Sequence, residues 1–226
     1  VRGTVTGVDS GTQTVTYLNA TGVTTTTTYS RLVMAPGIDF LPIPNFTGSD
    51  ANKAKVVHAW QAGPQTQSLR DQLVAMPKDA TVILTIPAKP YRCPPGPYER
   101  ACIIADWVKK NRRSATYKNA QVIVLDANPG ITAEVTNFTT AFNTVHAGVI
   151  QYVPNATVTA VNADTGDVET TAGTFRGKVL NVIPNHTAKQ IVRDMGLATS
   201  ATAAGGAFCP VDLLSYESKV TPGIHV

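Results

Sequence analysis

The sequence predicts an α/β fold, and three patterns carry that prediction. Two apolar runs of the kind found in buried strands, residues 81–86 and 121–126, flank a proline- and glycine-rich loop and a helical stretch at 98–110. Strand, loop, helix and strand in that order form a βαβ unit, which favours a parallel sheet covered by helices. Alternation of apolar and polar residues at 1–33 and at 156–184 predicts antiparallel meanders.

The composition is typical of a globular protein. Hydrophobic residues make up 43% of the 226 residues, charged residues make up 15%, and the net charge is +4. This balance argues against a disordered or coiled chain. No apolar run approaches the roughly 18 residues of a membrane span, so we expect none. Basic residues are scattered apart from a cluster at 109–113, which is typical of a helix C-terminus, and we expect no nucleic-acid partner.

Local patterns place the elements of the first half of the chain. Residues 31–35 form a short apolar run that Pro36 and Gly37 end, which predicts a strand. The prolines and the glycine at 42–48 indicate a linker. Leucine and methionine residues then recur at helical spacing, which predicts a helix over 65–76.

The second half repeats part of that order. In the helix at 98–110 we expect Ile103, Ile104 and Trp107 to face inward. A meander at 158–170 and an apolar strand at 178–184 that ends in proline follow the same order as the meander, apolar strand and proline near the start of the chain. Such a repeat fits two related dinucleotide-type domains. An all-β sandwich accounts for the meanders but not for a helix between two buried strands.

The loop at 87–97 is where we expect chemistry. In a dinucleotide-binding βαβ unit, the turn after the first strand carries Gly-x-Gly-x-x-Gly, so that backbone N–H groups can approach a pyrophosphate. Here the same place reads PAKPYRCPPGP. Prolines lack the N–H donor and stiffen the chain, which argues against phosphate binding. The sequence instead indicates a rigid loop that displays Cys93.

Cys93 is the candidate reactive group. It lies just before a predicted helix N-terminus and beside Arg92, and both favour the thiolate, the form that attacks sulfur. Glu99, in the first helical turn, is placed to accept or donate a proton. The structural alternative is a small buried cysteine in a proline-rich turn, with Glu99 complementing the helix dipole.

The other cysteines are interpreted as structural. Cys102 is expected to pack in the core, and Cys209 is expected in a loop, although a disulfide between Cys209 and Cys93 stays open. The sequence has three cysteines, an odd number, so they cannot all pair in disulfides. No spacing suggests a metal site. Three histidines are interpreted as ordinary loop or surface positions: His58, His146 and His186.

Seven stretches together resemble the flavoprotein subunit of flavocytochrome c sulfide dehydrogenase. They keep the order of that family over nearly the whole chain, and the cysteine loop is highly specific. The stretches are 29–40 (YSRLVMAPGIDF), 58–66 (HAWQAGPQT), 90–100 (PYRCPPGPYER), 181–184 (NVIP), 209–212 (CPVD), 216–219 (YESK) and 222–226 (PGIHV).

The resemblance implies an FAD-dependent flavoprotein with two dinucleotide-binding domains, related to glutathione reductase and sulfide:quinone oxidoreductase. Such enzymes oxidise sulfide at a redox-active disulfide beside FAD and pass electrons to a cytochrome c subunit that carries haem c. By this mapping Cys93 is one of the two active cysteines, and Glu99 is a carboxylate near the flavin. Ala35, Pro36 and Gly37 match a segment that lies against FAD. We expect a periplasmic location.

The resemblance also implies a domain division. Residues 1–46 and 188–226 would belong to the FAD-binding domain, and 47–187 to a second domain that no longer binds a nicotinamide cofactor. The pyrophosphate glycines are expected before Val1 and the second active cysteine beyond Val226. The chain is therefore expected to be truncated at both ends, catalytically incomplete, and unable to retain FAD alone.

Two rival interpretations remain. One is a non-enzymatic protein-interaction domain on a degenerate dinucleotide-binding fold. The other is a related enzyme of the sulfide:quinone oxidoreductase type.

Overall fold

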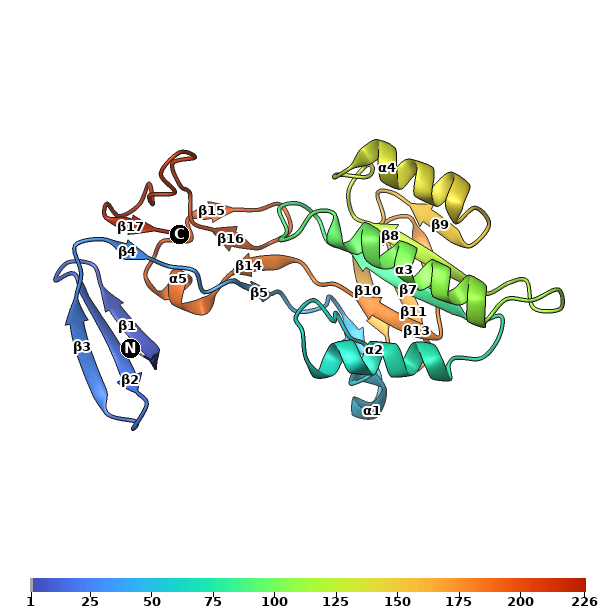
Figure 1. The fold of residues 1–226 in the computed structure, drawn as a ribbon, viewed down its shortest axis with the longest axis horizontal. Helices are drawn as coiled ribbons and strands as arrows, with labels where there is room; N and C mark the ends of the chain where they lie inside the picture. The colour runs from blue at the N-terminus through green and yellow to red at the C-terminus, as the bar shows by residue number, and fades with distance from the viewer. Residues whose placement is uncertain (1) are drawn as a thin grey trace. The chain divides into compact units, whose positions relative to one another are not determined.

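The computed structural model describes residues 2–226 and divides the chain into two compact units (Figure 1). Unit 1 comprises Val1–Leu41 and His186–Val226, and unit 2 comprises Pro42–Asn185. Parallel and antiparallel sheets occur together with helices, so the predicted α/β class is confirmed. No helix among the described residues is long and apolar enough to cross a membrane.

A parallel sheet forms the centre of unit 2 (Figure 1). Its strand order is β13 (Val179–Val182), β7 (Thr81–Ile86), β8 (Gln121–Asp126) and β9 (Ile150–Val153). Strands β7 and β8 pair in parallel along their full length, which confirms the predicted βαβ unit. Both strands are continuous apolar runs because helices and a second sheet leave neither face to water.

The helices of unit 2 cover this sheet. Helix α3 (Gly96–Asn111) packs on β7 and β8, and α2 (Pro64–Ala75) packs on β13. Shorter helical segments are α1 (Asp50–Lys53), α4 (Val135–Thr140) and the π-helical turn η1 (Ala141–Val145).

The buried face of α3 corrects one prediction. Ala101 and Ala105 are 0% exposed and Ile104 is 3% exposed, so these residues define the inner stripe. Ile103 is 70% exposed, and the expectation that it faces inward is wrong. Successive residues of an α-helix lie about 100° apart, and Ile103 is two positions from each alanine, on the opposite side of the helix. Trp107 is half-buried against the core.

An antiparallel sheet completes unit 2. Strands β10 (Val158–Asn162), β11 (Asp167–Thr170) and β12 (Gly173–Arg176) form the predicted meander, and β6 (Phe46–Thr47) joins β10 in parallel. The segment interpreted as a linker therefore contains a short strand. Gly166 makes the meander turn with φ of 78°, and a Cβ there would lie 2.2 Å from the carbonyl oxygen of Gly177. Only glycine fits that turn.

Unit 1 is built from short strands and one short helix. The meander of β1 (Gly3–Asp9), β2 (Thr14–Asn19) and β3 (Thr24–Thr28) is antiparallel, as predicted. Strand β4 (Leu32–Val33) pairs in parallel with β17 (Ile224–His225), and β5 (Ile38–Phe40) pairs antiparallel with β14 (His186–Ala188). The remaining elements are α5 (Gln190–Asp194), β15 (Ser200–Ala201) and β16 (Ala207–Phe208).

Two histidines that the sequence suggested were at the surface are buried. His186 is 1% exposed, because it lies opposite Phe40 in the β14–β5 ladder and its ring packs edge-on at 5.1 Å from the Phe40 ring. His146 is 6% exposed, because its backbone N–H closes the η1 turn on the carbonyl of Ala141. Burial and the charge of Lys109 lower the pKa of His146. The prediction of an ordinary loop or surface position is wrong for His186, which lies in a strand, whereas His146 lies in a turn but is buried.

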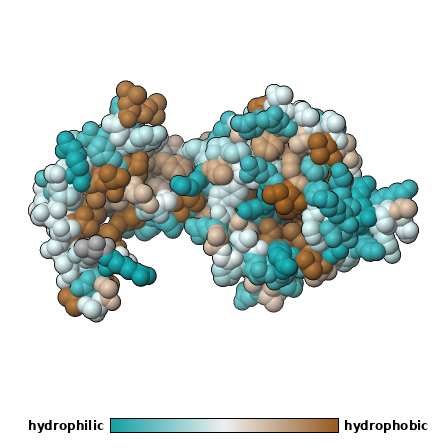
Figure 2. Space-filling view, viewed as in Figure 1, coloured by the Kyte–Doolittle hydropathy of each residue, from teal (hydrophilic) through white to brown (hydrophobic). Residues whose placement is uncertain are grey.

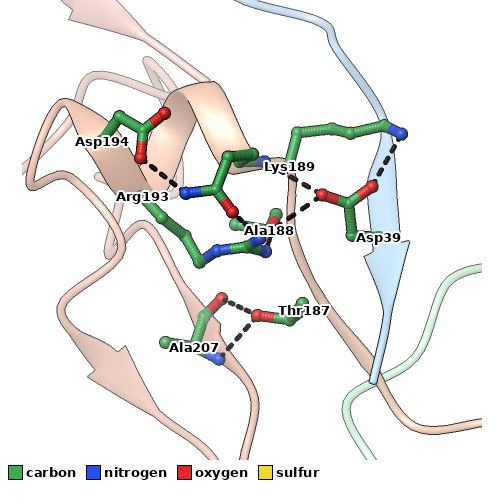
Figure 3. Close-up of polar contacts among 8 residues, drawn as sticks. Asp39, Thr187, Ala188, Lys189, Arg193, Asp194 and Ala207 are labelled. Atoms are coloured by element: carbon green, nitrogen blue, oxygen red, sulfur yellow. Dashed lines mark hydrogen bonds and ion pairs between the residues drawn. The ribbon is translucent and has the colours of Figure 1, made fainter. Parts of the chain in front are cut away.

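Asp39 ties β5 to the start of α5 (Figure 3). Lys189 Nζ lies 2.7 Å from Asp39 Oδ1, and the backbone N–H of Gln190 donates to Oδ2 at 3.0 Å. The Arg193 guanidinium lies 3.6 Å from the same carboxylate. Partial burial alone would raise the pKa of Asp39, but the hydrogen bonds from Lys189 and Gln190, with the nearby positive charges, hold it below its ordinary value.

A lowered carboxyl pKa stabilises the fold above the unfolded value and is lost as pH falls through the folded value. We expect Asp39→Asn to reduce the free energy of unfolding near pH 7 by about 0.5–1 kcal/mol, because solvent screens the ion pairs. The difference between variant and wild type should begin to shrink as pH falls below the ordinary aspartate pKa of about 3.9, and should vanish only below the lowered pKa of Asp39 in the folded protein. Urea unfolding followed by circular dichroism at several pH values measures this. A difference that persisted unchanged into strong acid would contradict it.

Candidate active site

Cys93 lies in the loop between β7 and α3, at the carboxyl end of the parallel sheet. Ligands of α/β sheets bind at this end. Cys93 is exposed and its φ is 59°, in the left-handed region that non-glycine residues rarely adopt. This conformation turns the chain so that the Gly96 N–H donates to the Cys93 carbonyl at 3.0 Å and α3 can begin. The loop therefore presents the thiol to solvent, as the sequence predicts.

Gly96 brings the thiol close to the helix N-terminus. A Cβ on Gly96 would lie 3.0 Å from Cys93 Sγ and 2.8 Å from the Trp60 ring. Both side chains therefore occupy the space that any larger residue would take. The sulfur lies at the first turn of a helix of 16 residues, where the helix dipole favours negative charge.

Arg100 is a residue of this site that was not identified from the sequence. Its half-buried guanidinium donates to the carbonyls of His58 at 2.8 Å and Ala59 at 2.5 Å. The same group lies over the Trp60 ring, 5.2 Å from its centroid. Burial lowers the pKa of Arg100, and the charge of Cys93 opposes that effect. The only sequence signal for Arg100 was its place in the cysteine motif, about one helical turn after Gly96.

Glu99 lies exposed in the first turn of α3, as predicted. Its charge acts on Cys102, which is partly buried against the core: burial first, and then Glu99, raises the pKa of Cys102. A proton-transfer role for Glu99 stays a prediction.

All three cysteines are free thiols in this structure. Cys209, in unit 1, donates from Sγ to Ser218 Oγ at 3.3 Å, which is consistent with a structural role. Among the described residues no group of three or more His, Cys, Asp or Glu is arranged to hold a metal ion.

A buried carboxylate lies beneath the cysteine loop. Asp126 is 0% exposed at the end of β8. Oδ2 accepts from the hydroxyls of Tyr98 at 2.8 Å and Tyr152 at 2.7 Å. Oδ1 accepts from the backbone N–H of Asn128 at 2.9 Å and from its side-chain amide at 2.8 Å. Burial and Asp126 raise the pKa of both tyrosines, so they stay protonated donors.

The same network holds the loop at both ends. Asn128 donates to the Pro87 carbonyl at 3.0 Å and accepts from the Lys89 N–H at 3.1 Å. Tyr91 donates to the Pro94 carbonyl at 3.2 Å and its hydroxyl lies 3.0 Å from Thr132 Oγ1. In dinucleotide-binding units, an acidic residue near the end of the second strand binds a ribose. Here both oxygens of that acid already accept hydrogen bonds within the chain.

Ala35 lines two apolar cavities of unit 1, of about 470 Å³ beside β17 and about 400 Å³ beside β1 and β2. Pro36 lines the second cavity, and Gly37 lines neither. Val33, which lines both, is 75% exposed, and Figure 2 shows apolar surface on this unit. A flavin ring is planar and largely apolar, so this lining fits it. A pyrophosphate needs the N–H donors of a glycine turn, and the 226 residues contain no Gly-x-Gly-x-x-Gly motif. The residues present fit the ring of FAD and not its phosphates.

Comparison with known proteins decides the family. Residues 66–184, more than half of the chain, match the family described as "Sulfide dehydrogenase [flavocytochrome c] flavoprotein chain, central". The chain belongs to this family. The match contains the whole Cys93 loop, α3 and the Asp126 network, so these features belong to the family's central region.

Solved structures show the same fold for this flavoprotein chain. The sulfide:quinone oxidoreductase of the bacterium Aquifex aeolicus superposes with a TM-score of 0.70 at 16% identity, over 100% of this chain and 51% of that one. NDH2 of Plasmodium falciparum gives 0.63 at 15% identity, over 100% and 48%. A pyridine nucleotide-disulfide family oxidoreductase of Enterococcus faecalis gives 0.62 at 12% identity, over 99% and 46%. The chain spans about half the length of these proteins, and its fold is that of two-domain flavoprotein oxidoreductases.

Proposed function

We propose that this chain is the central part of an FAD-dependent, sulfide-oxidising flavoprotein, and that Cys93 is the thiol that reacts. The placement of Cys93 carries the proposal: a stiff loop exposes its sulfur at the first turn of α3, beside Gly96. Family membership supports sulfide as the substrate and a cytochrome c subunit as the partner. We place the protein in the periplasm, as its resemblance implies.

The proposed first step is thiol–disulfide exchange with sulfide. HS⁻ attacks a disulfide that joins Cys93 to a second cysteine, which the resemblance assigns to a part of the protein after Val226. The disulfide S–S bond breaks, a persulfide forms on the attacked cysteine, and the other cysteine leaves as a thiolate. The sulfide sulfur loses two electrons and the disulfide gains them. The helix N-terminus favours the anionic sulfur, and Glu99 is the proposed proton acceptor.

The electrons are proposed to leave by way of FAD. When bound, FAD would supply the chemistry that couples two-electron oxidation of the reduced cysteine pair to one-electron release, which suits a haem c acceptor on the cytochrome subunit. In this chain Ala35 and Pro36 would contact the flavin ring, because they line the apolar cavities of unit 1.

Competitive alkylation tests the site assignment. We expect iodoacetamide in limiting amount, near neutral pH, to label Cys93 at least about ten times faster than Cys102, because burial raises the pKa of the Cys102 thiol and blocks access. Cys209 should be intermediate. Peptide mass mapping gives the three rates, and the urea-unfolded chain, in which all three thiols are equivalent, is the control. Labelling of Cys102 or Cys209 ahead of Cys93 would show that another thiol is the reactive one.

A further inference from the structure

The segment 57–60, which precedes α2, is fastened to both α3 and β13. Val57 forms a parallel bridge with Asn181, and the Asn181 amide donates to the Val57 carbonyl at 2.7 Å and the His58 carbonyl at 2.9 Å. Asn181 is 0% exposed. Its side-chain oxygen accepts from Arg100 at 3.2 Å. The guanidinium thus joins one buried amide of the sheet to two carbonyls of the segment.

The segment is also fixed from its other end. Gln65 Oε1 accepts from the N–H groups of His58 and Ala59, both at 3.0 Å. Ala59 is 3% exposed with a φ of 48°, so the chain turns sharply there. The turn directs Trp60 to the first turn of α3, where its ring occupies space beside Gly96 that a Cβ would need.

We propose that Arg100 is a positioning residue for the Cys93 thiol: its guanidinium ties the segment 57–60 to α3 and seats the Trp60 ring against Gly96, where Cys93 Sγ also lies. A planar fork with several donors is suited to binding two carbonyls and an amide oxygen while stacking on a ring, and an ammonium group is not. The fork therefore sets the wall of the site, and the charge of Arg100 interacts favourably with that of Cys93.

The other charged groups near the thiol do not replace Arg100. Burial raises the pKa of Tyr91, so its hydroxyl stays neutral. Burial and then the charge of Arg100 lower the pKa of His58, so that ring is neutral above pH 6.5. Glu99 is exposed and carries the opposite charge, and Arg92 is exposed on the loop itself.

Variants at Arg100 separate its fork from its charge. The sequence has two tryptophans, so in a Trp107→Phe background Trp60 is the only one that fluoresces. We expect Arg100→Gln to raise the midpoint of the pH profile of Cys93 alkylation by about 0.5–1 pH unit and to shift Trp60 emission to the red. Arg100→Lys should shift the emission but leave the midpoint near wild type. Arg70→Gln, the matched control at an arginine whose side chain is 69% exposed and outside the site, should change neither.

A merely structural role would lower the free energy of unfolding without moving the alkylation midpoint. Wild-type values of both midpoint and emission in Arg100→Gln would overturn the proposal, as would an equal midpoint shift in Arg70→Gln. If Arg100→Gln fails to fold, a red shift of the Trp60 emission in Arg100→Lys would support the proposal, and wild-type emission would overturn it. The inference rests on the proposed function only in taking Cys93 as the reacting thiol. Because iodoacetamide replaces sulfide here, failure of the sulfide chemistry and failure of the Arg100 role give different results.

Discussion

Replacing Asp126 with alanine should lower the free energy of unfolding by about 3–5 kcal/mol. The carboxylate is 0% exposed and accepts four hydrogen bonds. Its removal leaves buried donors of Tyr98, Tyr152 and Asn128 without an acceptor, and each such donor loses its compensation for desolvation. Asp126→Asn keeps one acceptor oxygen, so we expect a smaller loss of about 1–2 kcal/mol.

Urea unfolding followed by tryptophan fluorescence measures these losses. Asp71→Ala is the matched control, because Asp71 is a surface acid whose side chain is 58% exposed, and we expect a change within about 0.5 kcal/mol. A loss under about 1 kcal/mol in Asp126→Ala would mean that the network does not hold the loop. Amide hydrogen exchange at 87–97 should rise in Asp126→Asn even while the protein stays folded, because Asn128 then loses part of its anchor.

The βαβ core could be predicted because its signals are local. Strands β7 and β8 are unbroken apolar runs, and such runs are short enough to exclude a helix. Helix α3 begins at Gly96 rather than at Tyr98, because proline in the first helical turn needs no hydrogen bond and Pro97 is tolerated there. The sequence pattern predicted Gly96 and Pro97 as the last two residues of the loop.

The exposed position of Cys93 in the loop before α3 could also be predicted, because neighbouring prolines indicate a stiff loop and the following residues indicate a helix start. Ile103 could not be placed correctly, because two adjacent isoleucines lie about 100° apart on a helix and the local pattern does not show which of them is nearer the core. The buried His186 gives no signal either, since its partner Phe40 is far away in the sequence.

The supporting residues escape sequence reasoning for the same physical reason. Arg100 reaches carbonyls of residues 41 and 42 positions earlier, and an amide 81 positions later. The sequence pattern shows Asp126 only as the last residue of a strand, because the tyrosines that donate to it lie 28 and 26 positions away. Contacts of this kind depend on which strands become neighbours, and one sequence does not show that.

Replacing Cys93 with serine should abolish sulfide-dependent electron transfer, lowering its rate by at least about a thousandfold in the flavin-loaded protein. A serine hydroxyl cannot form the disulfide that sulfide attacks, and no persulfide can be made on it. The exchange removes no buried contact, because Cys93 is exposed, so the free energy of unfolding should change by under about 0.5 kcal/mol. Cys102→Ser is the matched control and should keep at least about half the wild-type rate.

The most direct measurement is anaerobic addition of sulfide to the flavin-loaded protein while the visible absorbance of the flavin is followed. We expect the wild type and Cys102→Ser to bleach, with one extra sulfur atom recovered on the Cys93 peptide or on its disulfide partner. Cys93→Ser should bind FAD normally and stay yellow. The full-length flavoprotein is used for all three proteins, because the disulfide partner of Cys93 is proposed to lie outside this chain. Bleaching of Cys93→Ser at the wild-type rate would contradict the assignment of Cys93 as the reacting thiol.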